Sequence, residues 1–262
     1  MFVLQISVTP SAVGQIKAEL TKSLPTVKSS HRAEALARGL GFRTYAALLA
    51  GSRSPEPLVA IVTGSHFVDY LREHGFEAEP TVLYLAGAKA IIVGLLETMP
   101  KLSIHGLGFG RPRRNPDGSW QSSEQRVAEF LERREACLHQ RSAEAFLRSL
   151  ALLSRVTATK TIRAGTGSYR LKHIAENYVC FYPDGAKLGP DYVPNGMLIA
   201  AAVHMGFKYK AHVDDLGYDT LNASFNMSKA IIDDLDAETR PHFYSNRVRN
   251  RRLAPVISRL SA

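Results

Sequence analysis

The sequence predicts a mostly α-helical protein with a few short strands, an α+β fold in which a helical N-terminal module and a helical C-terminal domain are joined by a long helix. Apolar side chains recur at helical spacing along much of the chain. Serine, threonine, glycine and proline stand at positions that begin and end such helices. Only two short runs, residues 2–7 and 58–63, indicate strands.

We expect residues 1–100 to form a helical N-terminal domain. Thr9 followed by Pro10 marks the start of a first helix that ends near residue 23, because proline at the first helical position sacrifices no hydrogen bond. A polar connection at 51–57 precedes the strand expected at 58–63. The other helices of this domain are expected at 31–39, 44–50, 66–74 and 83–99.

Three of the expected helices end in the same way, with Gly-Phe at 41–42, at 75–76 and at 206–207. A glycine just past the last helical residue, followed by an apolar side chain that folds back onto the last turn, is typical of a Schellman cap. We interpret the recurrence as shared capping chemistry and not as a structural repeat.

Residues 31–50 place two short helices around a glycine-bearing turn, as a helix-turn-helix does. In a DNA-reading version, Arg43, Thr44 and Tyr45 would open the second helix. That helix is short and consists mainly of alanine and leucine, which leaves few side chains for base contacts. We therefore favour packing of a helical hairpin over DNA reading.

Residues 29–51, SSHRAEALARGLGFRTYAALLAG, are similar to a small helical module of bacterial proteins labelled glyoxalase-related, many of which are encoded on plasmids and other mobile elements. The resemblance covers about the first fifty residues and carries over no catalytic residue, so it implies no glyoxalase activity. Further on, SYRLKHIAENY (168–178) and YVPNGMLIAAAVHMGF (192–207) resemble a pattern of plasmid- and phage-borne proteins. This second resemblance implies a mobile genetic element as context and no particular chemistry.

Residues 101–156 are expected to form a basic hairpin and a bridging helix. The glycines of GLGFGRPRRNPDGSW (106–120) invite comparison with a phosphate-binding loop, but its prolines and the NPDG turn prevent a helix from starting there. An exposed hairpin that presents arginines beside Phe109 and a tryptophan suits single-stranded nucleic acid, and a solvated basic loop is the alternative. The candidate contact residues are Arg111, Arg113, Arg114 and Trp120.

Ser122 and Gln125 form the pattern of a capping box, which predicts the start of a long helical region that continues toward Val156. We expect this region to bridge the two domains. Its arginines alternate with glutamates, an arrangement typical of a solvated helix face with ion pairs at i,i+4 spacing.

Residues 157–262 are expected to form the C-terminal domain with an arginine-rich tail. Helices are predicted at 169–178, at 226–239 and, capped by Asn195, at 197–205, where the run is too apolar to be exposed and too short to span a membrane. The tail could supply a salt-dependent affinity for phosphates, with a disordered or self-packed tail as the alternative. Its candidate contact residues are Arg247, Arg249, Arg251 and Arg252.

A metal or hydrolytic centre is the strongest candidate for enzyme chemistry, although no known motif has this spacing. Its potential ligands are His173, Glu176, His204, His212, Asp214 and Asp215. Cys180 near His173 would be a nucleophile pair without an orienting acid. We accordingly assign no catalytic residue, no metal and no cofactor.

The 262 residues carry a formal net charge of +9 with a pI near 9.6, which favours polyanionic partners, although a merely basic globular protein is the alternative. The two cysteines, Cys137 and Cys180, lack the spacing of a zinc site or a disulfide framework. The first residues, MFVLQISVTP, lack the features of a signal peptide or an anchor. We expect a cytoplasmic location and no membrane partner.

These features predict a non-enzymatic protein of a mobile genetic element that binds nucleic acid or a nucleoprotein complex. The alternative is a counter-defence, anti-CRISPR-like inhibitor that binds a host protein assembly. A metal-dependent hydrolase or nuclease is the third possibility.

Overall fold

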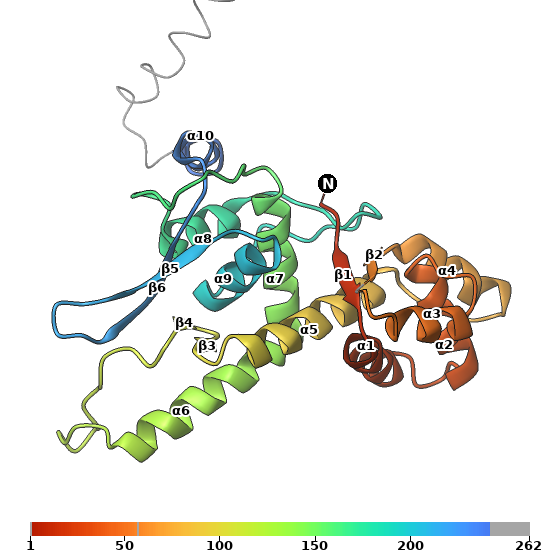
Figure 1. Cartoon of the computed structure of the whole chain (residues 1–262), viewed down its shortest axis with the longest axis horizontal. Helices are drawn as coiled ribbons and strands as arrows, with labels where there is room; N and C mark the ends of the chain where they lie inside the picture. Colours follow the sequence, from red (N-terminus) through yellow and green to blue (C-terminus); the bar gives the residue numbers. More distant parts are fainter. Residues whose placement is uncertain (1, 57, 242–262) are drawn as a thin grey trace, which may run out of the picture.

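The computed structural model describes residues 2–56 and 58–241 and confirms a mostly helical α+β fold (Figure 1). Over these residues, helices alternate with two small sheets, one of two strands and one of four. The N-terminal helices gather on one side of the molecule, and the C-terminal helices and the larger sheet lie on the other (Figure 1).

The N-terminal side combines a two-stranded sheet with four helices. Strand β1 (Gln5–Val8) pairs antiparallel with β2 (Leu58–Ile61), with Gln5 opposite Ile61. The predicted cap at Thr9 is confirmed, because its Oγ1 accepts a hydrogen bond from the Ala12 amide at 3.1 Å. The helices are α1 (Pro10–Ser23), α2 (Ser29–Gly39), α3 (Tyr45–Ser52) and α4 (Gly64–Glu73).

Helix α5 (Thr81–Thr98) runs from one side of the molecule to the other and packs against α1 and against α7 (Gln140–Leu153) (Figure 1). Its buried face is built largely from alanine, glycine and isoleucine, which allows neighbouring helices to approach closely. Of the helices in the described residues, α5 is long and apolar enough by composition to cross a membrane, a property that it shares with core helices of globular proteins.

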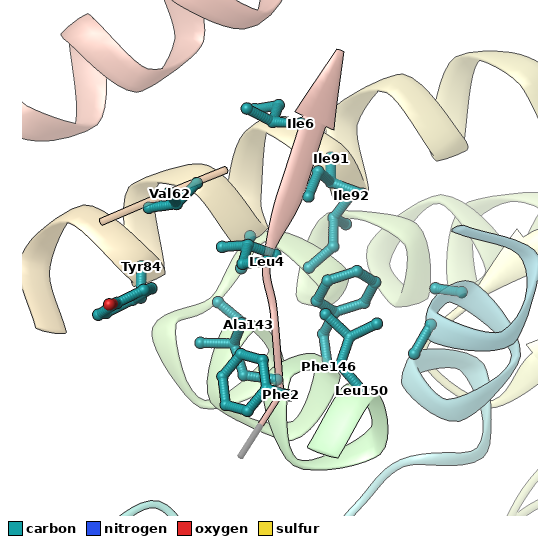
Figure 2. Packing of buried hydrophobic residues seen from close by; sticks show 14 of the residues in the cluster. Phe2, Leu4, Ile6, Val62, Tyr84, Ile91, Ile92, Ala143, Phe146 and Leu150 are labelled. Carbon is teal, nitrogen blue, oxygen red and sulfur yellow. The ribbon is translucent and has the colours of Figure 1, made fainter. Parts of the chain in front are cut away.

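The two sides share one hydrophobic core. Phe2 and Leu4, just before β1, insert between α5 and α7, where they meet Ile92 and Phe146 (Figure 2). Each fully buried side chain of this size contributes roughly 1.5–3 kcal/mol to the free energy of unfolding. The N-terminal segment therefore ties the helical module to the C-terminal helices.

The predicted long helix from Ser122 toward Val156 is wrong as a continuous element. Its capping box is confirmed, and α6 (Ser123–Glu135) starts there. A short 3₁₀ helix, η1 (Ala136–Leu138), then tightens the chain, and His139 is extended with φ −66° and ψ 152°. The Ser142 hydroxyl donates to the Ala136 carbonyl across this break at 2.7 Å, so α7 starts in a new direction.

The C-terminal side contains α8 (Ser168–Asn177), α9 (Asn195–His204) and α10 (Lys229–Thr239). The expected cap at Asn195 is wrong: Pro194 is the residue before the helix, and the side-chain amide of Asn195 instead donates to the Leu221 carbonyl at 2.8 Å. The larger sheet has the order β3-β4-β6-β5. Its strands are β3 (Leu102–Ser103), β4 (Gly106–Leu107), β5 (Tyr209–Val213) and β6 (Asp219–Phe225).

The glycines of the 106–110 segment serve close backbone packing. A Cβ atom on Gly106, which has φ +132°, would lie 1.9 Å from the Leu221 carbonyl oxygen, and one on Gly108 would lie 2.1 Å from the Asp219 carboxylate. The segment forms β4 and turns, and no helix starts there. This agrees with the prediction that no helix starts in this segment.

The three shared helix ends are confirmed as Schellman caps. Gly41, Gly75 and Gly206 all adopt positive φ, between 78° and 81°. The amide of each following phenylalanine donates back to the carbonyl five residues earlier, at 2.8 Å from Phe42 to Ala37 and at 3.0 Å from Phe207 to Ala202.

Candidate nucleic-acid interface

Residues 108–122, which we name the basic loop, leave the sheet at β4 and return into α6. The loop and α6 extend away from the body of the molecule, as does the β5–β6 hairpin (Figure 1). Arg111, Arg113 and Arg114 are all exposed, so the loop presents three cations on a projecting part of the surface.

The tip of the basic loop is an ordered hairpin. Arg114 and Trp120 face each other as an antiparallel bridge, and the Asn115 amide donates to the Ser119 carbonyl at 2.7 Å. Between them Gly118 adopts φ +85°, which favours glycine, and the Asp117 carboxylate accepts from the Ser119 amide at 2.9 Å. These local bonds set the positions of the side chains on either side of the turn.

Arg114 and Trp120 form a stacked pair at the base of this turn. The guanidinium carbon lies 4.7 Å from the centre of the indole ring, and the same guanidinium donates to the Gly118 carbonyl at 2.7 Å. The Trp120 side chain is nevertheless 60% exposed. A flat cationic group on a flat aromatic ring, open to solvent, offers both charge and a stacking surface.

The other two arginines of the loop are held by acidic partners. Arg111 pairs with Asp214 at the turn of the β5–β6 hairpin, and the hydrogen bond from Arg111 holds the pKa of that carboxyl below its usual value. Arg113 lies 3.5 Å from Glu129 of α6. Both arginine side chains stay more than 60% exposed, so these pairs orient the cations without covering them.

The loop is anchored to α6 by aromatic stacking. The ring centres of Phe109 and Phe130 lie 4.5 Å apart, with the ring planes inclined by 29°. Arg126 donates to the Gly110 carbonyl at 2.9 Å and lies over the Phe109 ring. The loop therefore has a firm base as well as an ordered tip.

The arginines of α6 and α7 are only partly on a solvated face. Arg134 donates to carbonyl oxygens at the C-terminal end of α5, those of Leu96 at 2.6 Å and of Met99 at 3.2 Å, and so acts as a cap. Arg148 is buried, which corrects the prediction of a solvated arginine at this position. These two cations hold helices and loops together and are not available to a ligand.

The four predicted tail residues, Arg247, Arg249, Arg251 and Arg252, lie outside the described residues. Residues 242–262 contain five arginines and no acidic residue, so they account for five of the nine excess positive charges.

The helix-turn-helix segment uses its candidate DNA-reading residues for its own packing. Thr44 caps α3 through a hydrogen bond from the Ala47 amide at 3.1 Å. The Tyr45 amide donates to the Glu34 carboxylate of α2 at 3.0 Å, which joins the two helices. Arg43 is exposed on the rim of a shallow pocket of about 490 Å³. The contacts of Thr44 and Tyr45 are those of a packed helical hairpin.

The potential metal ligands that the sequence analysis considered are dispersed. His173 pairs with Glu176 at 2.6 Å on α8, whereas His204 packs against the Phe146 ring and His212 bonds to the Ser224 hydroxyl. Within residues 2–56 and 58–241, no three His, Cys, Asp or Glu side chains come together as metal ligands would. Burial raises the pKa of Cys180 to about 11, which is unlike an activated nucleophile.

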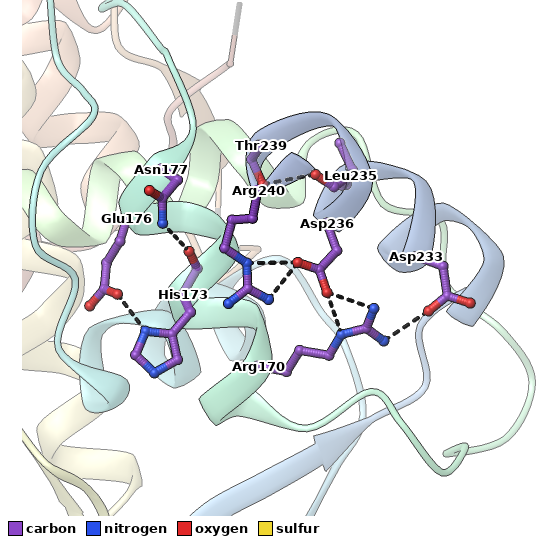
Figure 3. A network of polar contacts seen from close by, with 9 residues as sticks. All are labelled: Arg170, His173, Glu176, Asn177, Asp233, Leu235, Asp236, Thr239 and Arg240. Atoms are coloured by element: carbon purple, nitrogen blue, oxygen red, sulfur yellow. Dashed lines mark hydrogen bonds and ion pairs between the residues drawn. The ribbon is translucent and has the colours of Figure 1, made fainter. Parts of the chain in front are cut away.

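Helix α8 carries a polar network that the sequence did not reveal (Figure 3). Arg170 pairs with Asp233 at 2.8 Å and with Asp236 at 2.7 Å, and thereby joins α8 to α10. One turn further on, Glu176 accepts hydrogen bonds from His173 and from Lys172, at 2.6 and 2.7 Å. Burial raises the pKa of Glu176, but these two hydrogen bonds outweigh it, so the pKa lies below the ordinary value.

The spacing of His173 and Glu176 is that of residues on one helix face. The acidic partners of Arg170, by contrast, lie more than sixty positions away in the sequence, so only the folded chain shows them.

Comparisons of the chain with protein-family models, with curated proteins and with solved structures found no match.

Proposed function

We propose that the protein is a non-enzymatic binder of nucleic acid, of the kind that a mobile genetic element encodes, and that the basic loop is its principal contact within the described residues. The observation that carries this proposal is the exposed Arg114–Trp120 stack on a projecting, ordered hairpin. Two further exposed arginines, Arg111 and Arg113, flank the stack and can neutralise phosphates.

The arrangement favours single strands over duplex. A base can stack on Trp120 or on the Arg114 guanidinium only when its face is free, as it is in an unpaired strand. The arginine-rich tail, including Arg247 and Arg249, is proposed to add contacts to phosphates that do not depend on base sequence. A nucleoprotein complex that exposes single-stranded nucleic acid would bind to the same surface of the basic loop.

The experiment measures binding of a fluorescein-labelled twelve-nucleotide single strand by anisotropy across a salt series. Replacing Arg111, Arg113 and Arg114 together with alanine should weaken binding and flatten the slope of log affinity against log salt by about two units, roughly 0.7 for each single-strand phosphate contact. The matched control replaces Lys22, Arg53 and Arg72, three exposed cations on the N-terminal side of the molecule, and should change the slope much less.

Trp120 provides an independent signal because it is the single tryptophan of the chain. Stacking of a base on the indole should quench its fluorescence as the oligonucleotide saturates the protein. Absence of binding by the wild-type chain, or equal slopes in the loop variant and the control variant, would refute the role of the basic loop.

A second candidate is an inhibitor that binds a host protein assembly. It is favoured by Val127 and Leu131, two apolar side chains one turn apart on the projecting helix α6, which are 47% and 58% exposed. Changing both to glutamate should abolish a stoichiometric protein complex recovered from nuclease-treated host cells and leave oligonucleotide affinity unchanged. Recovery of the same complex with this variant would exclude α6 as the contact.

A further inference from the structure

A second surface feature lies away from the basic loop, at the start of α7. A pocket of about 570 Å³ opens between residues 139–144 and the segment 191–194, and it is lined by Arg141, Arg148 and Tyr192 among others. Its volume falls within the range of about 300–1,000 Å³ that is usual for small-ligand sites. None of the sequence-predicted contact residues lines it.

Tyr192 stands at this pocket beside a buried cation. The Lys172 ammonium lies 4.9 Å from the centre of the Tyr192 ring and 5.6 Å from that of Tyr169. The Lys172 side chain is only 8% exposed, whereas the tyrosines are 63% and 57% exposed. One buried charge therefore adjoins two aromatic rings that are open to solvent.

The charge of Lys172 is balanced locally. Its ammonium donates to the Glu176 carboxylate at 2.7 Å, and Glu176 also accepts from His173. Since Glu176 supplies the counter-charge, the two tyrosine rings are not needed to neutralise the cation. They remain available as stacking surfaces.

The backbone that carries Tyr192 is held by Arg148. This buried guanidinium donates to the Leu188 carbonyl at 2.7 Å and to the Tyr192 carbonyl at 3.2 Å. It also pairs with Asp191 at 2.9 Å and with Glu144 at 3.4 Å. The two acidic residues that line the pocket are thus engaged by a cation, and the tyrosine is positioned before any ligand arrives.

Arg141 supplies an uncommitted positive charge on the same pocket. It is exposed, and it forms no ion pair within the part of the chain that the structure describes. A planar ring and a free guanidinium around one cavity match the two chemical parts of a nucleotide, which are a base that stacks and a phosphate that is negatively charged.

From this arrangement we infer that the pocket holds one nucleotide of a bound single strand, with its base stacked on Tyr192 and its phosphate paired with Arg141, and that Tyr169 offers a stacking surface to a neighbouring base. This inference rests on the proposed function and adds a second contact to that of the basic loop. Duplex does not fit the pocket, because the faces of paired bases are covered by their neighbours in the stack.

The test compares the labelled twelve-nucleotide strand with its duplex on the full-length protein. Tyr192→Ala should weaken single-strand binding about 5- to 150-fold and leave duplex binding unchanged. Tyr192→Phe keeps the ring and should bind within about twofold of wild type. Phe181→Ala, which removes an exposed ring 49% open to solvent that does not line the pocket, is the matched control and should have no effect.

Arg141→Gln should flatten the salt dependence of single-strand affinity by about 0.7, the contribution of one phosphate contact. Quenching of Trp120 at saturation should be the same in Tyr192→Ala as in wild type, because the basic loop still engages the strand. If circular dichroism shows that Tyr192→Ala does not fold, Tyr169→Ala on the exposed side of α8 replaces it, with a smaller loss expected for single strands alone.

The outcomes separate the two proposals. A wild-type chain that binds neither strand nor duplex overturns the proposed function and the pocket together. A wild-type chain whose binding depends on Arg111, Arg113 and Arg114 but is unchanged by Tyr192→Ala overturns the pocket and leaves the loop. Equal losses for single strand and duplex in Tyr192→Ala would also overturn it, since base stacking cannot produce them.

Discussion

Two of the sites at which a cation lies over an aromatic ring in the described residues differ in burial. In the basic loop, Arg114 lies over Trp120 at a hairpin tip where Trp120 is 60% exposed. On α8, Lys172 is enclosed between the rings of Tyr169 and Tyr192 and is neutralised by Glu176. A cation–aromatic contact is thus exposed to solvent in the basic loop and buried on α8.

The difference shows which cation the fold depends on. An exposed cation–aromatic pair contributes about 0.5–1 kcal/mol, so the loop can exchange it for a ligand at little cost. A buried ammonium without its counter-charge costs several kcal/mol, so Lys172 and Glu176 must stay together. The α8 cluster is therefore a fixed support for its tyrosines, whereas the basic loop is adaptable.

The largest effect is expected from breaking the buried pair. Glu176→Gln should lower the free energy of unfolding by about 3 kcal/mol, at the low end for a buried ion pair, because both side chains keep slight contact with solvent. The measurement is a urea titration at pH 7. The double variant Lys172→Met with Glu176→Leu should recover much of the loss, since it removes both charges.

The control for this comparison is an exposed pair of similar spacing. Asp69 and Arg72 lie one turn apart on α4 with side chains 56% and 61% exposed. Asp69→Asn should change the free energy of unfolding by less than about 1 kcal/mol. A loss in Glu176→Gln no larger than this would show that the α8 pair is not effectively buried.

A second prediction concerns how the free energy of unfolding changes at acidic pH. The pKa of Glu176 is lower in the folded protein than its ordinary value of 4.5, so the unfolded chain binds the proton more readily. The stability that this group contributes is fully present above about pH 4.5 and is lost as the pH falls through the lower, folded-state pKa. Asp233, held by Arg170 and Lys229, behaves likewise.

Urea midpoints measured between pH 6 and pH 3 should therefore fall more steeply in the wild type than in Glu176→Gln, which has no proton to gain at this position. The difference in urea midpoint between the wild type and Glu176→Gln should become smaller as the pH drops. Parallel curves over the whole range would show that the pKa of Glu176 is not lowered by folding.

The sequence predicts those features of the fold that depend on neighbouring residues, and it misses those that depend on residues far apart in the chain. The caps at Thr9, Thr44 and Ser122 and the glycine turns at Gly41 and Gly206 were all readable, because each depends on residues within one helical turn. The β5–β6 hairpin was missed. Its strands lack clear alternation, and they pair through a turn that includes Asp214 and Gly217, residues that by themselves do not distinguish a hairpin from a loop.

The break between α6 and α7 also escaped prediction, since the apolar spacing continues through it. The 3₁₀ turn is accompanied by the hydrogen bond from Ser142 to Ala136 and by packing of η1 against α5, and neither is visible in that spacing. For the candidate site, the basic loop was found from composition. The partners that orient it, such as Asp214 for Arg111, lie about one hundred residues away and follow only from the folded sheet. The burial of Lys172 and Arg148 likewise depends on long-range packing, which the local sequence pattern does not show.

The third prediction weakens the restraint on Arg111. Asp214→Asn keeps the side-chain oxygen that accepts from the Leu216 and Tyr218 amides, so the hairpin turn should survive. It removes the negative charge that competes with a phosphate for Arg111. Oligonucleotide affinity should rise, with a salt slope steeper by up to about 0.7 on single strands. Unchanged affinity would mean that Arg111 does not face the bound strand.

The smallest effect is expected from the exposed pair itself. A double-mutant cycle with Arg114→Ala and Trp120→Phe should give a coupling free energy for folding of about 0.5–1 kcal/mol or less, measured by urea titration followed by circular dichroism. The Gly118 carbonyl would lose its guanidinium donor but stays exposed, so water can replace it. Oligonucleotide binding by the same variants should change more than their stability does. The stack contributes little to the free energy of unfolding, whereas it presents both a guanidinium charge and an indole ring to a ligand. A coupling of several kcal/mol would instead make the Arg114–Trp120 stack a structural support like the one on α8, and the contrast between the two clusters would fail.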